Sequence, residues 1–200
     1  DKGKKIVCLY ATDKDAQYSF IQTAKNKGYD VLHLDCEVDS HFVNLLERKF
    51  EDMRFARVDS DSIDNLIPKE EKIKPQMSET DSADLSTLFK SVLPKGNDYY
   101  VQPDNLGADA DPILITQSEF MRRWREMSAM GGGMNFYGSM PEAYEVKVNM
   151  ENPLVAKIWG DRENTSELLR QVVDLALLGS GLLKGKALAD FIARSEKLLK

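Results

Sequence analysis

Short apolar runs alternate with helical stripes in the first third of the chain. Residues 6–10 form a continuous apolar run, which is typical of strands covered on both faces, residues 31–34 repeat the strand pattern, and residues 54–58 supply a third short strand. Between these strands, residues 14–27 and 39–50 place apolar side chains on one stripe of a helix. Strands that alternate with amphipathic helices predict a small parallel α/β sheet.

A charged segment follows this first unit. Residues 68–75 carry Lys-Glu-Glu-Lys-Ile-Lys between two prolines, so the segment has little to bury and cannot continue a helix. We expect this segment to be a linker between two domains. The first domain is then residues 1–67 and the second is residues 76–200.

The second domain has the pattern of an α+β fold. Residues 82–93 place leucine, phenylalanine and valine at helical spacing. Residues 99–102, 113–116 and 143–149 predict strands, and the last of these alternates apolar with charged side chains. We expect a half-buried antiparallel sheet.

A stripe of methionine and aromatic residues follows the second of these strands. Residues 119–130 predict an amphipathic helix that ends at Gly131-Gly132-Gly133. Such a stripe is most often core, but methionine enrichment beside glycines also suits a surface that repacks against varied partners. Both interpretations stay open for the eight side chains concerned: Phe120, Met121, Trp124, Met127, Met130, Met134, Phe136 and Tyr137.

Two leucine-rich helices joined by a short glycine loop end the chain. Their stripes present apolar surface on more sides than a small sheet covers, and uncovered surface of this kind promotes aggregation. We expect two copies to pair these helices into a dimeric four-helix bundle. The predicted interface consists of Leu168, Leu169, Val172, Val173, Ala176, Leu177, Leu188, Phe191, Ile192 and Leu198.

Composition and charge narrow the function. The chain is 42% hydrophobic and 30% charged, as in globular proteins, and its net charge of −6 argues against nucleic acid as a partner. The sequence contains no apolar run of membrane-spanning length and no signal peptide, so we expect a cytoplasmic protein without membrane contact.

Candidate chemistry is sparse. His33 and His41 are too few ligands for a closed zinc site, and no serine or cysteine has a credible base. We therefore expect no catalytic residue, no metal and no cofactor. The alternative is a small α/β phosphate- or nucleotide-binding domain with an appended oligomerisation module, in which Asp13, Asp35 and Asp39 lie near one edge of the sheet.

Several segments resemble the ninety-kilodalton heat-shock chaperones of the bacterial type. Gly28-Tyr29-Asp30-Val31-Leu32, followed by a helix from Asp39, is similar to the last α/β subdomain of their middle domain. Residues 149–155, Asn-Met-Glu-Asn-Pro-Leu-Val, are similar to their Asn-Pro-x-His-Pro-Leu-Val segment, although Asn152 replaces histidine. Residues 165–194 are similar to their dimerisation helices.

The resemblance implies a homodimeric, client-contacting part of an ATP-dependent chaperone. It implies that Mg-ATP is bound by an N-terminal domain absent from this sequence, so that this part is not an enzyme. Unfolded or partly folded proteins would then be the clients, and residues 120–137 match the client-contacting element by position. The Met-Glu-Glu-Val-Asp tail of eukaryotic relatives is absent, so docking of tetratricopeptide co-chaperones is not implied.

Overall fold

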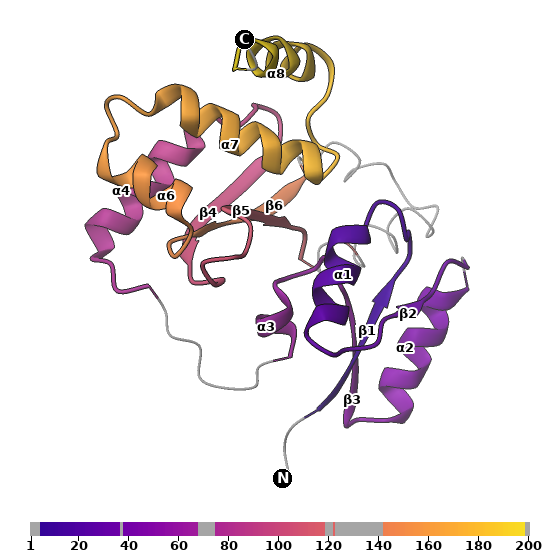
Figure 1. Ribbon diagram of the computed structural model, residues 1–200. Helices are drawn as coiled ribbons and strands as arrows, with labels where there is room; N and C mark the ends of the chain where they lie inside the picture. Colours follow the sequence, from indigo (N-terminus) through magenta and orange to yellow (C-terminus); the bar gives the residue numbers. More distant parts are fainter. Residues whose placement is uncertain (1–4, 37, 68–74, 119–121, 123–141, 199–200) are drawn as a thin grey trace. The chain divides into compact units, whose positions relative to one another are not determined.

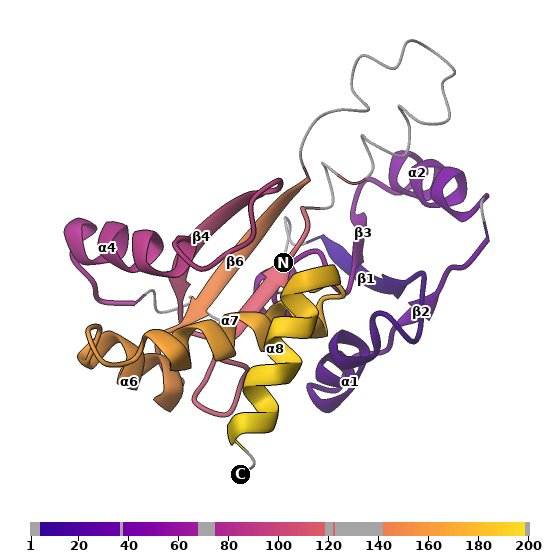
Figure 2. The same ribbon diagram turned by 90° about the horizontal axis from the view of Figure 1, so that it is seen from above.

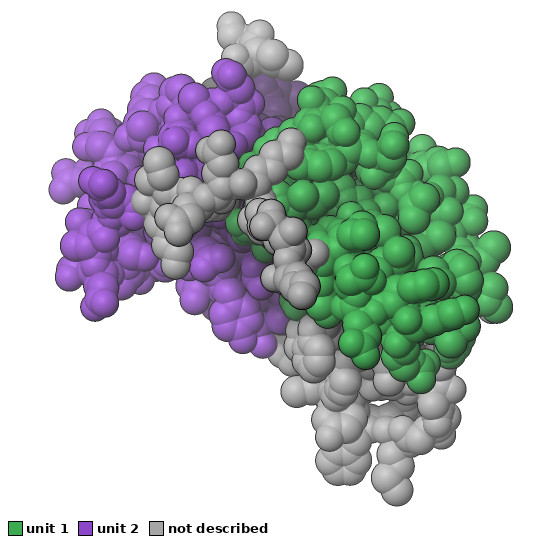
Figure 3. All heavy atoms as spheres, turned by 90° about the horizontal axis from the view of Figure 1, so that it is seen from below, with its two compact units in different colours: residues 1–72, 116–132 green, residues 73–115, 133–200 purple. Residues whose placement is uncertain are grey.

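The structure is a computed structural model, and it describes residues 5–36, 38–67, 75–118, 122 and 142–198. The chain divides into two compact units, coloured separately in Figure 3: residues 1–72 with 116–132, and residues 73–115 with 133–200. Of the described residues, 116–118 and 122 are grouped with the first unit.

The first unit contains the predicted parallel sheet. The central strand β1 (Ile6–Ala11) pairs in parallel with β2 (Leu32–His33) on one side and with β3 (Met53–Arg57) on the other (Figure 1). Both connections contain a helix, α1 (Tyr18–Asn26) and α2 (Asp39–Lys49). The α/β class predicted for this part of the chain is confirmed, and a short helix α3 (Ile63–Leu66) follows β3.

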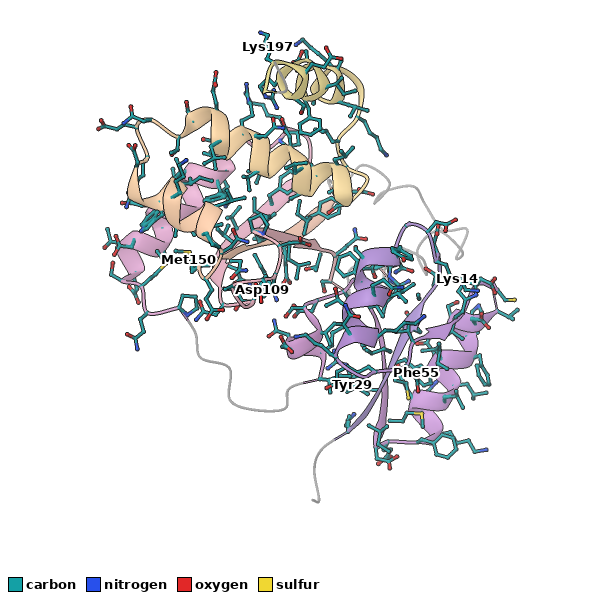
Figure 4. All side chains as sticks on the ribbon, in the orientation of Figure 1. Lys14, Tyr29, Phe55, Asp109, Met150 and Lys197 are labelled. Atoms are coloured by element: carbon teal, nitrogen blue, oxygen red, sulfur yellow. The ribbon has the colours of Figure 1, made fainter. Side chains whose placement is uncertain are left out.

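Side chains alternate along β1 and divide the core of this unit into two clusters. Leu9 and Ala11 pack with Ile21 of α1 on one face, and Tyr10 packs with Val43 of α2 and Phe55 on the other, where Figure 4 labels Phe55. A backbone group on the free edge of β3 also has a hydrogen-bond partner, because the Phe55 N–H donates to the Glu47 carboxylate of α2 at 2.7 Å. Each helix therefore covers one face of the sheet.

Helix α1 begins four residues later than its pattern predicts. The side-chain amide oxygen of Gln17 accepts hydrogen bonds from the backbone N–H groups of Thr12 and Asp13, at 2.8 and 3.0 Å, and holds the preceding residues in a turn. The helix ends at Asn26, one residue before its predicted end, and Gly28 follows with a φ of 83°, which is accessible to glycine at little cost. The end of the helix was therefore easier to predict than its start.

The second unit is built on a sheet with the strand order β4-β6-β5. Strand β4 (Asp98–Asp104) runs parallel to β6 (Ala143–Asn149), with Tyr99 opposite Tyr144, and β5 (Ile113–Thr116) lies on the other side of β6. The prediction of an antiparallel sheet is wrong for β4 and β6.

Helix α4 (Glu79–Lys90) begins three residues before its predicted start. Its N-cap is Ser78, whose hydroxyl accepts from the Asp81 N–H.

The error in pairing has a physical cause in β6. Its alternation of valine with charged or polar residues suggested that one face meets water, but Lys147 and Asn149 are as buried as Val146 and Val148. The Lys147 ammonium lies 3.9 Å from the Asp104 carboxylate. A polar residue that is paired in this way is buried without breaking the strand, so alternation alone did not reveal the second covered face.

Asn149 anchors the loop between β4 and β5. Its amide nitrogen donates to the Gly107 carbonyl at 2.8 Å, and its amide oxygen accepts from the Leu106 N–H at 3.2 Å. The Gly107 N–H in turn donates to the Glu151 carboxylate at 2.7 Å. The segment that resembles the chaperone motif thus has a structural role, because it holds a loop more than thirty residues away in sequence.

The same motif starts a helix that the sequence pattern did not predict, α6 (Pro153–Gly160). Asn152 is its N-cap and accepts from the Leu154 N–H at 2.9 Å, while Pro153 occupies the first turn. An asparagine followed by proline is a recognisable helix start, so this element was predictable. The Asn152 amide nitrogen also donates to the Ala110 carbonyl at 2.9 Å and ties the helix to the anchored loop.

Replacing Asn152 by alanine is expected to lower the free energy of unfolding by about 1–2 kcal/mol, through loss of the cap and of the Ala110 contact. Urea denaturation measures the change. The matched variant Asn152→Ser keeps an accepting oxygen at the N-cap without placing a carboxylate oxygen against the Ala110 carbonyl, so it should retain most of the capping contribution. An Asn152→Ser variant as unstable as the alanine variant would contradict the assignment of the cap.

Candidate dimerisation surface on the terminal helices

The last two helices, α7 (Ser166–Gly179) and α8 (Gly185–Leu198), carry the predicted dimer interface. They are joined by a short turn in which Gly181 has a positive φ of 69°. Figure 1 shows α7 between the sheet and α8, and Figure 2 shows α8 crossing above α7, with Lys197 near its free end in Figure 4. The predicted pair of helices joined by a glycine loop is confirmed.

The inner face of α7 completes the core of the second unit. Leu169, Val172, Val173 and Leu177 are each at most 3% exposed, and they pack in one cluster with side chains of α4, α6 and the sheet. Phe191 of α8 belongs to the same cluster. These five side chains are covered without a second copy of the chain.

Five of the ten predicted interface residues are therefore not free, and the expectation that a single chain leaves them uncovered is wrong. The sheet with α4 and α6 offers more covering surface than the pattern indicated, because α6 was not predicted. Leu168, Ala176 and Leu188 are half-buried against the same cluster, Ile192 is exposed, and the side chain of Leu198 lies outside the described residues. The dimer itself stays a prediction.

A different set of apolar residues is exposed on the helical pair. Leu175 and Leu178 of α7 are 51% and 41% exposed, and Ile192 of α8 is 48% exposed. Only Ile192 was among the predicted residues. The signal for the other two was present in the sequence, since residues 175–178 are apolar at consecutive positions and cannot all face one side of a helix.

Two polar contacts join α8 to α7. The Arg194 guanidinium forms a hydrogen-bonded ion pair with the Asp174 carboxylate, and the Gln171 amide donates to the Ser195 hydroxyl at 2.9 Å. Asp174 is 8% exposed, so its charge is largely removed from water. An ion pair of this kind constrains geometry strongly, because loss of either partner leaves a charge uncompensated.

A second ion pair lies on the outer surface of α8. The Lys186 ammonium bonds the Asp190 carboxylate at 2.5 Å, one helical turn along. This hydrogen bond lowers the pKa of Asp190 below its ordinary value. Both side chains are exposed, so the pair is screened by solvent and contributes little to stability.

The predicted client-contacting residues lie outside the described part of the chain. All eight, Phe120, Met121, Trp124, Met127, Met130, Met134, Phe136 and Tyr137, are among the residues whose placement is not described. Arg122, between them, is described, and its guanidinium donates to the Tyr10 hydroxyl of β1 at 2.6 Å. Client contact by this segment stays a prediction.

The acidic residues of the alternative hypothesis do not form one site. Asp35 and Asp39 lie close together with Cys36, but the Asp39 carboxylate accepts from the Cys36 N–H at 2.9 Å and so serves the start of α2. Asp13 is not part of this group, and its carboxylate accepts from two N–H groups of its own turn. Cys8 and Cys36 are both free thiols.

Comparison with known proteins shows which proteins the chain resembles. No protein-family model matches the chain. Over its whole length, however, it is 38% identical to the chaperone protein HtpG of Porphyromonas gingivalis and 33% identical to that of Bacteroides fragilis. Over its whole length the chain is similar to HtpG chaperones.

The chain spans 39% of the length of these HtpG relatives. The alignment runs over 267 positions, more than the 200 residues of the chain, so the relatives carry residues within the matched region that this chain lacks. A third relative, the HtpG of Bacteroides thetaiotaomicron, is 33% identical with the same coverage. No helix within the described residues has the length and apolar character needed to cross a bilayer.

Proposed function

We propose that this chain corresponds to the C-terminal part of an ATP-dependent HtpG chaperone and supplies its homodimerisation surface and part of its client-binding surface. The observation that carries the proposal is the exposed group on the terminal helices, formed by Leu175, Leu178 and Ile192. The core beneath this group is already closed, so the exposed side chains are free to meet another protein. We call these three residues the outer patch.

A second copy is the partner that suits the outer patch best. In a two-fold dimer each copy contributes the same three apolar side chains, so six are removed from water together. Burial of this apolar area stabilises association by roughly 25 cal/mol for each Å² removed from water. A homodimer would therefore cover the same surface that would otherwise promote aggregation.

The oligomeric mass of the chain tests the homodimer. Sedimentation equilibrium at micromolar concentration is expected to give twice the mass of one chain. Deleting residues 161–200 would not be a useful control, because it removes Leu169, Val172 and Leu177 from the core. Point substitutions on the outer patch leave that core intact, and a monomeric parent chain would refute the homodimer.

Client contact is proposed for the segment that contains Met121, Trp124 and Met134, on the strength of its methionine and aromatic content. Alanine substitution of these three residues in the full-length chaperone is expected to weaken its suppression of client aggregation severalfold. The dimer mass should not change. Unchanged suppression would remove the segment from the client-binding surface.

Tryptophan fluorescence tests whether Trp124 is accessible to clients. The other tryptophan, Trp159, stacks under the Arg162 guanidinium, whose carbon lies 3.5 Å from the ring centroid. In a Trp159→Phe variant only Trp124 emits, and we expect strong quenching by acrylamide that an unfolded client protein reduces. The matched Trp124→Phe variant reports Trp159, whose quenching should not respond to the client; equal responses would contradict the proposal.

We further propose that this part of the chaperone is not an enzyme and holds no cofactor, with Mg-ATP bound elsewhere in the longer protein. Calorimetric titration of the chain with Mg²⁺ and ATP is expected to show no heat of binding. Saturable binding would favour the alternative, a phosphate- or nucleotide-binding role for the first unit.

A further inference from the structure

A charged residue of α7 is buried where it contacts α8. Asp174 lies between Val173 and Leu177 in position and is 8% exposed. Its carboxylate bonds Arg194, twenty residues later on α8. Because the carboxylate is largely buried, any displacement of α8 that separates the pair leaves its charge uncompensated. The position of α8 is thus coupled to a single side chain of α7.

A second contact fixes the rotation of α8. Gln171, one turn before Asp174, donates to Ser195, the neighbour of Arg194. Two adjacent residues of α8 therefore bond two residues of α7 that lie one turn apart. We call these four residues, Gln171, Asp174, Arg194 and Ser195, the polar clasp.

The polar clasp is not fully satisfied. The Gln171 amide oxygen and the Arg194 Nε are buried and make no hydrogen bond to any residue that the structure describes. A partly satisfied polar network stabilises a fold less than well-packed apolar side chains of similar volume. We therefore expect the clasp to contribute to the orientation of α8 on α7 more than to the free energy of unfolding.

The clasp also determines which apolar side chains lie together. As the residue number increases along α7, the residue number of the bonded partner on α8 decreases, so the two helices run antiparallel. One turn after Gln171 stands Leu175, and one turn before Ser195 stands Ile192. Residues one turn apart share a helix face, so the clasp brings Leu175 of α7 and Ile192 of α8 to the same side of the helical pair.

We propose that the polar clasp is an orientation device that assembles the outer patch for a second copy of the chain, a role that rests on the proposed homodimer. Asp174 and Arg194 are positioning residues: they hold Ile192 of α8 in line with Leu175 and Leu178 of α7. Without them α8 still covers the core through Phe191, but its outer residue is no longer held in register with those of α7.

The test separates orientation from stability by replacing the ion pair with apolar residues. In the double variant Asp174→Leu/Arg194→Met, we expect the dissociation constant of the dimer to rise about tenfold or more in sedimentation equilibrium. The urea midpoint, measured in the monomeric Leu178→Glu background, should be unchanged or higher. A merely structural ion pair would instead give a lower midpoint together with the weaker dimer, and that result would overturn the proposal.

A second variant covers the case in which the first does not fold. Gln171→Leu/Ser195→Ala removes the other contact, leaves the ion pair in place, and is expected to weaken the dimer severalfold at an unchanged midpoint. The control is Asp190→Asn, which breaks the exposed ion pair with Lys186 and should change neither quantity. A dimer as tight as the parent's in both clasp variants would overturn the clasp and leave the homodimer standing, whereas a monomeric parent chain would overturn both.

Discussion

Replacing Leu178 by glutamate is expected to dissociate the proposed homodimer, with a rise in its dissociation constant of about a hundredfold or more. Leu178 is 41% exposed on the outer side of α7, so the substitution introduces a carboxylate where the second copy would bury an apolar side chain. Two-fold symmetry places the same charge on both copies, so the desolvation cost is incurred twice. Sedimentation equilibrium over a range of concentrations measures the change.

The matched control for this substitution is Leu154→Glu. Leu154 lies on α6 of the same unit and is also 41% exposed, so both variants add the same charge at the same degree of exposure. The control should remain dimeric, because α6 is not part of the outer patch. Dissociation by both variants would show that net charge is responsible, and dissociation by neither would exclude Leu178 from the interface.

The sequence pattern predicted the first unit well because β1 is a continuous apolar run and amphipathic helices separate the strands. The parallel pairing followed from these helices, although the edge strand β2 is exposed at both Leu32 and His33 and is not covered as its pattern indicated. The start of α1 was missed because Gln17 holds the preceding turn through a side-chain contact that local propensity does not describe.

The second unit was harder to predict because its polar residues are buried. Lys147 and Asn149 follow the alternation of a strand with one wet face, yet their partners come from distant loops and strands. The burial of five predicted interface residues in the core was missed for a related reason. Leu169 and Leu177 carry the same hydrophobic signal as Leu178, and only the covering elements α4 and α6 distinguish the buried positions from the exposed one.

This distinction leads to a prediction for two neighbouring leucines that the sequence alone treats as equivalent. Leu177 is 1% exposed in the core cluster, so Leu177→Ala is expected to lower the free energy of unfolding by about 2–5 kcal/mol, through lost apolar contacts and the cavity left behind. Urea denaturation in the monomeric Leu178→Glu background measures this loss without a contribution from association. In the same background the exposed Leu154→Ala should cost at most about 0.5 kcal/mol. A Leu177 variant as stable as this control would mean that α7 does not close the core, and the outer patch would then have to be sought on the opposite face of the helix.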